Sequence, residues 1–133
     1  MSAIQELVEL SPKEQINLIR AGISTAVFDA VAETYGLSRE AFADKLGLSI
    51  RTVNRKKKDG AHLGHVESER VLRAARLHHL ARILYATDEA AGAWLSEPTP
   101  AFGGAAMLEL VDTDIGYDQV HGYVLGLAHG VFQ

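Results

Sequence analysis

The sequence contains no cysteine. Disulfide bridges and zinc sites with thiolate ligands are therefore excluded, and a reducing compartment is the expected location. Long apolar runs are also missing: none approaches the ~20 residues that a membrane-spanning helix needs. Residues 1–10 lack the basic region and apolar core of a secretory signal. We therefore expect a cytoplasmic protein with no membrane partner.

Basic residues are absent after Arg82. All 13 Lys and Arg lie at or before this residue, together with ten of the 17 acidic residues. Residues 1–82 thus carry a formal charge of +3 and the remainder −7, a division that the net charge of −4 hides. Such a division indicates two partners of opposite electrostatic character.

Sustained period-two alternation is absent too, whereas signals for helix starts and stops are frequent. Ser11-Pro12 with Glu14 is a capping box, and Gly22 is a plausible stop. With 133 residues, 47% of them hydrophobic, the chain can bury the core of one domain or two very small ones. We predict an all-α fold.

Residues 38–58 have the pattern of a helix-turn-helix motif. Ser38 caps a short helix, Gly47 makes the turn, and Ser49 caps a second short helix. In such motifs the second helix enters the major groove of DNA. The Gly-rich residues 59–65 form the predicted linker. We therefore predict a DNA-binding helix-turn-helix region over residues 1–61 and a second helical domain over residues 62–133.

The second helix of this motif carries a basic run without any acidic residue, SIRTVNRKKK. At about 100° per residue, Ile50 and Val53 face the core, and Lys57 falls on the same side as Ile50. Guanidinium groups pair with guanine edges or phosphates, lysines with phosphates, and a capped helix start presents amides to a phosphate. The predicted DNA-binding residues are Ser49, Arg51, Thr52, Asn54, Arg55, Lys56 and Lys58. The alternative, a solvated basic helix end that complements the helix dipole, stays open.

Groups that could bind a metal or catalyse a reaction are few. His62 and His65 lie in a Gly-rich segment without a carboxylate or thiol between them, so we predict no metal site. Asp112, Asp114 and His121 could form an acid–base group, but their place at a helix start favours capping. We predict neither an enzyme nor a cofactor.

Residues 66–85 form the longest helical pattern, which also offers a surface for dimerisation. Its apolar stripe could be either the seam of a homodimer or part of the core of a single chain. The stripe comprises Val71, Leu72, Ala75, Leu80, Ile83 and Leu84.

A last helix starts at Thr113 or Asp114, and Gly130 is its expected stop, which would leave an apolar tip at the end of the chain.

The C-terminal half also contains a set of short motifs: the Arg-bearing helix 70–76, Trp94-Leu95, PAFGG at 100–104, LEL at 108–110 with Asp112-Thr113, Gly116, and HGVF at 129–132. With these motifs it resembles the toxin-binding domain of Xre/MbcA/ParS-type antitoxins. The N-terminal half is similar to the Xre-like helix-turn-helix region that precedes this domain in antitoxins of RES–Xre modules. Met107 departs from the family, which usually has Pro at the start of the short helix.

The resemblance implies a concrete function. Such antitoxins neutralise a cognate RES-domain toxin, an NAD-consuming enzyme, by covering its active site. They also repress their own operon through the helix-turn-helix, commonly as dimers. The expected partners are thus a RES-domain toxin, operator DNA and a second copy of the chain. The expected toxin-binding residues are Asp112, Asp114, Asp118, His129, Gly130, Val131 and Phe132. The alternative is a plain transcriptional regulator whose C-terminal half only dimerises or senses a ligand.

Overall fold

The computed structural model describes residues 2–131, and these confirm the all-α prediction. They form eight α-helices and two short 3-10 helices, and the one β-type pairing among them is an isolated bridge between Pro98 and Ala106. The elements are α1 (Ala3–Glu9), α2 (Pro12–Ala21), α3 (Thr25–Thr34), α4 (Arg39–Lys45), α5 (Ile50–Lys58), α6 (His65–Ala81), α7 (Asp88–Ser96), η1 (Pro100–Phe102), η2 (Met107–Asp112) and α8 (Asp114–Val131). None of these helices is both long and apolar enough to cross a membrane.

Hydroxyl side chains start most of the helices, as the sequence predicts. The Ser11 hydroxyl accepts a hydrogen bond from the Glu14 amide, and the Glu14 carboxylate accepts one from the Ser11 amide, which completes the capping box. The Ser38 and Ser49 hydroxyls accept from the amide three residues later and so cap α4 and α5, and Thr113 Oγ1 accepts from the Gly116 amide at the start of α8. Each such cap stabilises its helix by about 1 kcal/mol.

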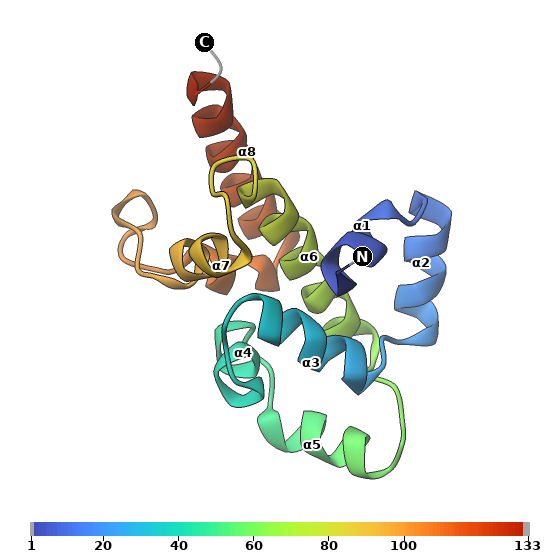
Figure 1. Ribbon diagram of the computed structural model, residues 1–133. Helices are drawn as coiled ribbons and strands as arrows, with labels where there is room; N and C mark the ends of the chain where they lie inside the picture. Colours follow the sequence, from blue (N-terminus) through green and yellow to red (C-terminus); the bar gives the residue numbers. More distant parts are fainter. Residues whose placement is uncertain (1, 132–133) are drawn as a thin grey trace.

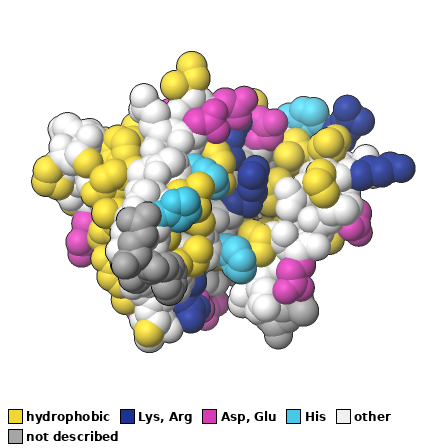
Figure 2. All heavy atoms as spheres, turned by 90° about the horizontal axis from the view of Figure 1, so that it is seen from above, with side chains coloured by type: hydrophobic (Ala, Val, Ile, Leu, Met, Phe, Trp, Pro, Cys, Tyr) yellow, Lys and Arg dark blue, Asp and Glu magenta, His cyan; other side chains and the backbone are white. Residues whose placement is uncertain are grey.

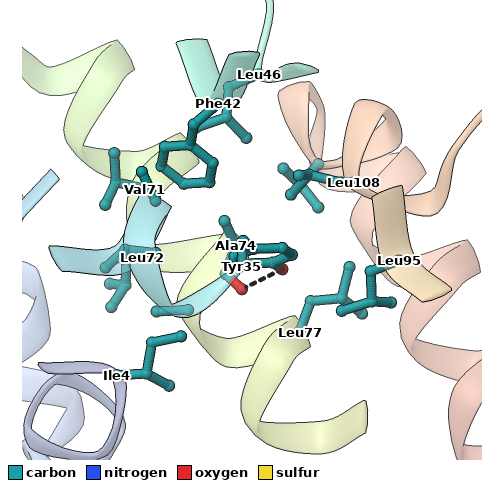
Figure 3. Packing of buried hydrophobic residues seen from close by; sticks show 14 of the residues in the cluster. Ile4, Tyr35, Phe42, Leu46, Val71, Leu72, Ala74, Leu77, Leu95 and Leu108 are labelled. Carbon is teal, nitrogen blue, oxygen red and sulfur yellow. Dashed lines mark hydrogen bonds between the residues drawn. The ribbon is translucent and has the colours of Figure 1, made fainter. Parts of the chain in front are cut away.

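Helix α6 is the centre of the molecule and contacts α1, α2, α3, α7, η2 and α8 (Figure 1). Val71 and Leu72 of its apolar stripe pack inside a single chain (Figure 3) and, like Ala75, are at most 3% exposed. Of the two alternatives for this stripe, its central residues follow the second and form the core of the monomer, whereas Ile83, beyond the end of α6, is 48% exposed.

Residues of both halves of the chain share this core. The buried hydroxyl of Tyr35, which follows α3, donates a 2.7 Å hydrogen bond to the carbonyl oxygen of Ala74 in α6 (Figure 3). Gly92 lets α7 approach the backbone of Tyr35 so closely that a Cβ there would lie 2.5 Å from the Tyr35 oxygen. The predicted linker is itself anchored, since Leu63 is buried and its amide donates to the Ile23 carbonyl. The boundary at residues 61/62 stays a prediction.

Some predicted helix boundaries are wrong. Helix α6 ends at Ala81, where a turn follows, and α8 is one residue longer than α6. Helix α8 continues through Gly130 to Val131, so Gly130 does not stop it. A single glycine costs a helix only about 1 kcal/mol, and it ends one reliably only when it adopts a left-handed conformation. Ile115 in the first turn of α8 is 75% exposed.

Helix α1 is absent from the sequence-based prediction. It is seven residues long, and it buries Ile4 and Leu7 as it packs on α3 and α6. By contrast, α2 has the stronger helix signals but no fully buried residue, and its Ile16 is 48% exposed.

Candidate functional site

Helices α4 and α5 meet at the turn that a helix-turn-helix requires. Gly47 adopts φ 67°, in the left-handed region that favours glycine, and the Leu48 amide donates to the Ala43 carbonyl oxygen at 2.8 Å. Val53, on the inner side of α5, is fully buried. Helix α5 consequently lies along one edge of the molecule, at the bottom of Figure 1.

The outer side of α5 carries the predicted DNA-binding residues. Arg51, Asn54, Arg55 and Lys58 are exposed, and Thr52 and Lys56 are half-buried. Ser49 is exposed, while its hydroxyl is occupied as the cap of α5. The structure thus brings all seven residues onto one short helix and its cap, although their contacts with DNA stay a prediction.

A network of charged groups behind this face was not predicted. Arg39 in α4 binds Asp29 of α3 through two hydrogen bonds of 2.7 Å, and its third nitrogen donates to the Asn54 side-chain oxygen at 3.1 Å. Lys57 Nζ lies 3.5 Å from the same Asp29 carboxylate, and the Lys57 side chain remains 52% exposed. The Arg39 guanidinium, with a smaller effect of Lys57, holds the pKa of Asp29 below its usual value against partial burial.

The predicted toxin-binding residues lie along α8 and just before it. Asp112, Asp118, His129 and Gly130 are exposed, and Asp114 is also exposed although it is ion-paired. The remaining two positions, Phe132 and the side chain of Val131, lie outside the residues that the structure describes.

Arg73 of α6 ties the start of α8 to the core. Its guanidinium lies 2.8 Å from Asp114 and 3.4 Å from Glu69, and it donates to the Val111 carbonyl oxygen at 3.1 Å. The Arg73 side chain is 14% exposed and the Asp114 side chain 88%. Asp114 therefore holds α8 in place and still presents carboxylate surface to solvent.

The outer side of α8 is narrow. Gly122, Gly126 and Gly130 recur every four residues and so share one side of the helix. All three are exposed, and a Cβ at any of them would have no neighbouring atom within 4 Å. Ile115 lies seven residues before Gly122, on the same side. We call these four residues the glycine face of α8.

Ion pairs join the basic and the acidic parts of the chain. Lys45 lies 3.8 Å from Glu109, Arg73 binds Asp114, and Arg82 binds Asp88. The division of charge in the sequence is thus partly neutralised in space. Among residues 2–131, the acids after Arg82 that make no ion pair are Glu89, Glu97, Asp112 and Asp118.

A groove of about 240 Å³ opens between the α1–α2 hairpin on one side and α6 with α8 on the other. The Arg76 guanidinium lies 5.1 Å from the centre of the Tyr117 ring, and the Tyr117 and His121 rings are 5.6 Å apart. Figure 2 shows basic and histidine side chains around a hollow on the upper face. The groove unites residues from three segments, so periodicity in the sequence could not predict it. It is lined by Val8, Gln15, Arg76, His79, Leu80, Ile83, Tyr117 and His121.

Residues 2–131 contain no group of three or more His, Asp or Glu side chains that could hold a metal ion. No hydrogen bond among the described residues joins Asp112, Asp114 and His121: the Asp114 carboxylate binds Arg73, and the His121 ring lies tilted beside Tyr117.

Two protein-family models match the chain. The antitoxin Xre-like helix-turn-helix domain matches residues 14–76, and the antitoxin Xre/MbcA/ParS C-terminal toxin-binding domain matches residues 80–130. The "Prs ADP-ribosylating antitoxin" of Sphingobium sp. (strain YBL2) is 28% identical over 139 residues, which cover 98% of this chain and 87% of that protein. "Antitoxin Xre" of Yersinia enterocolitica serotype O:8 / biotype 1B (strain NCTC 13174 / 8081) is 26% identical over 118 residues, covering 88% and 80%.

Proposed function

Since the chain belongs to the Xre/MbcA/ParS family of antitoxins, with a helix-turn-helix and a toxin-binding domain, we propose that it neutralises a cognate RES-domain toxin. In this proposal the antitoxin covers the active site with which the toxin consumes NAD. The same protein represses its own operon in the bacterial cytoplasm by binding operator DNA through α5.

The shape of α8 is the observation that carries the toxin proposal. Its C-terminal end projects past the neighbouring elements (Figure 1), although Val124 and Ala128 on its inner side are buried, and the glycine face leaves its outer side narrow enough to enter a cleft. Asp112 and Asp118 near its base are exposed carboxylates, which would steer the helix toward a pocket that is cationic because it binds the phosphates of NAD. The Sphingobium relative has ADP-ribosylation in its name, a reaction that takes its ADP-ribose group from NAD.

The outer side of α5 supports the DNA proposal. Among the described residues, its arginines and lysines make no ion pair, except for Lys57, which pairs with Asp29. One short recognition helix makes too few contacts for high specificity, and two-fold operators are bound by two-fold dimers. We therefore propose a homodimer on DNA, through a surface other than the buried stripe of α6.

The second candidate function is a plain transcriptional regulator that senses a ligand. The groove beside Tyr117 is the observation that favours it, because a guanidinium and two imidazoles meet apolar walls there. Co-expression separates the two functions. The antitoxin proposal requires that the chain rescue cells from the product of a neighbouring gene, and a regulator would not.

The DNA proposal is tested by the double variant Arg51→Ala/Arg55→Ala. We expect it to lose operator binding and to keep toxin neutralisation, since both side chains point away from the core. Each lost phosphate contact should reduce the log–log salt dependence of binding by about 0.9. The matched control is Lys13→Ala/Arg20→Ala, which removes two exposed charges from α2. Wild-type affinity in the Arg51/Arg55 variant would exclude α5 as the recognition helix.

A further inference from the structure

We propose that Arg39 is a positioning residue for DNA recognition: anchored on Asp29, it holds the Asn54 side chain of the recognition helix in a single orientation. The proposal rests on DNA binding by α5, as proposed above, and adds a role for two residues that lie outside that helix.

Three helices contribute to the arrangement. Asp29 of α3 accepts from Arg39 Nε through one carboxylate oxygen and from Nη2 through the other, both at 2.7 Å. Such a bidentate pair uses one whole edge of the guanidinium and fixes its plane. The remaining nitrogen, Nη1, is thereby directed at α5, where it donates to Asn54 Oδ1 at 3.1 Å.

The chemistry of the two side chains determines which end of the amide faces Arg39. Arginine has only donors, so the atom that faces it must be the oxygen of Asn54 and cannot be the nitrogen. The Nδ2 group and the second lone pair of Oδ1 then remain for a ligand. Because Asn54 is exposed, the amide presents a donor and an acceptor in a fixed order on the outer side of α5. An amide without this partner would rotate freely and lose entropy on binding.

The charge of Arg39 is already balanced within the protein. The Arg39 and Asp29 side chains are 24% and 31% exposed, and the carboxylate also has Lys57 Nζ at 3.5 Å. Arg51 and Arg55, in contrast, are exposed and make no ion pair among the described residues. Arg39 thus contributes to the orientation of a neighbour, whereas the arginines of α5 are free to meet phosphates. This difference can be measured.

The salt dependence of binding separates these roles. A residue that contacts a phosphate contributes about 0.9 to the log–log slope, whereas a residue that only orients a neighbour contributes nothing to it. A good contact to a base is worth about 1–3 kcal/mol of discrimination, roughly 5- to 150-fold. When the fixed orientation of Asn54 is lost, the discrimination between operator and non-specific DNA should fall by a factor in the lower part of that range.

The experiment uses the full chain and an operator selected from a random DNA library by the wild-type protein. Operator and non-specific affinities are measured over a salt series for the wild type, Arg39→Met, Asn54→Ala and the double variant. For Arg39→Met we expect the ratio of specific to non-specific affinity to fall about five- to tenfold, with an unchanged salt slope. In the Asn54→Ala background the same change should have no further effect on this ratio.

Two controls separate orientation from folding. Arg39→Lys keeps the charge beside Asp29. Its single ammonium nitrogen, however, cannot form a bidentate pair with Asp29 and also reach Asn54. We expect it to restore the thermal stability of Arg39→Met and not its specificity. Arg82→Met removes an arginine from the Arg82–Asp88 pair, away from α5, and should leave the specificity unchanged.

Three results would overturn the proposal. A slope reduced by about 0.9 in Arg39→Met would make Arg39 a phosphate contact. Specificity that is unchanged, or that Arg39→Lys restores in full, would leave Arg39 a purely structural role. Effects of Arg39→Met and Asn54→Ala that simply add would show that the two residues act independently. If the wild type selects no operator at all, it is the proposed DNA binding itself that fails.

Discussion

Replacement of the glycines on the outer side of α8 by alanine should stabilise the protein and weaken its binding to the toxin. Gly122 and Gly126 lie in the interior of this helix and are exposed, and a Cβ at either position would meet no atom within 4 Å. Glycine in a helix interior is about 0.5–1 kcal/mol less favourable than alanine, because it loses more conformational freedom on folding. Gly122→Ala and Gly126→Ala should therefore each raise the free energy of unfolding by about that amount.

The expected change in melting temperature follows from the size of the chain. With about 2.1 cal/mol/K of unfolding entropy per residue, 133 residues give about 0.3 kcal/mol/K. Each substitution should thus raise Tm by about 2–4 °C, which thermal unfolding followed by circular dichroism can measure.

The same substitutions should act in the opposite direction on the toxin. If the glycine face lies in a closely packed cleft, an added methyl group overpacks it, at a cost of about 1–3 kcal/mol. That corresponds to about a 5- to 150-fold rise in the inhibition constant for the NAD-consuming reaction. A variant with a raised Tm that inhibits as well as the wild type would refute the placement of this face in the toxin. A variant with a lowered Tm would contradict the open surroundings of the two glycines.

Three further predictions concern the core. Gly92→Ala should destabilise the protein by about 2 kcal/mol or more in urea titrations, because its Cβ would lie 2.5 Å from the backbone carbonyl oxygen of Tyr35. This effect is opposite in sign to that of the α8 glycines. Tyr35→Phe should cost about 1 kcal/mol in the same assay, since it removes the 2.7 Å hydrogen bond to Ala74. Burial lowers the pKa of His78 below 6.5, and its hydrogen bond to the Asp88 carbonyl offsets this only in part. Since the folded state prefers the neutral ring, its contribution should be complete above pH 6.5 and be lost as pH falls through the lowered pKa, and His78→Gln should flatten this dependence.

Local signals made much of the fold predictable from the sequence. The capping box at Ser11 and the caps at Ser38 and Ser49 depend on residues only three positions apart, so they can be recognised without the tertiary structure. The outward side of α5 follows from helical periodicity in the same way. Helix α1 has such a cap too, since the Ser2 hydroxyl accepts from the Gln5 amide, and the prediction missed it. The burial of Ile4 and Leu7, in contrast, depends on α3 and α6 and cannot be seen in so short a segment.

What the sequence could not reveal depends on contacts between distant segments. Periodicity identified the apolar stripe at 71–84 but could not say what covers it, and the structure shows that the single chain covers its central residues and leaves Ile83 exposed. Asp29 and Arg39 are ten residues apart, on different helices, and only the packing of α3 on α4 and α5 brings them to Asn54. The pairing of Asp114 with Arg73 joins residues 41 positions apart.

The most direct test of the account is the rate of NAD consumption by the toxin encoded beside this gene, titrated with the full chain and with a chain that lacks its last four residues. If α8 covers the active site, as we propose, the full chain should stop the reaction at a stoichiometric ratio. The truncated chain should fold and bind operator DNA as before, and it should leave most of the NAD consumption intact. Equal inhibition by the two chains, or a neighbouring protein that consumes no NAD, would contradict the central claim.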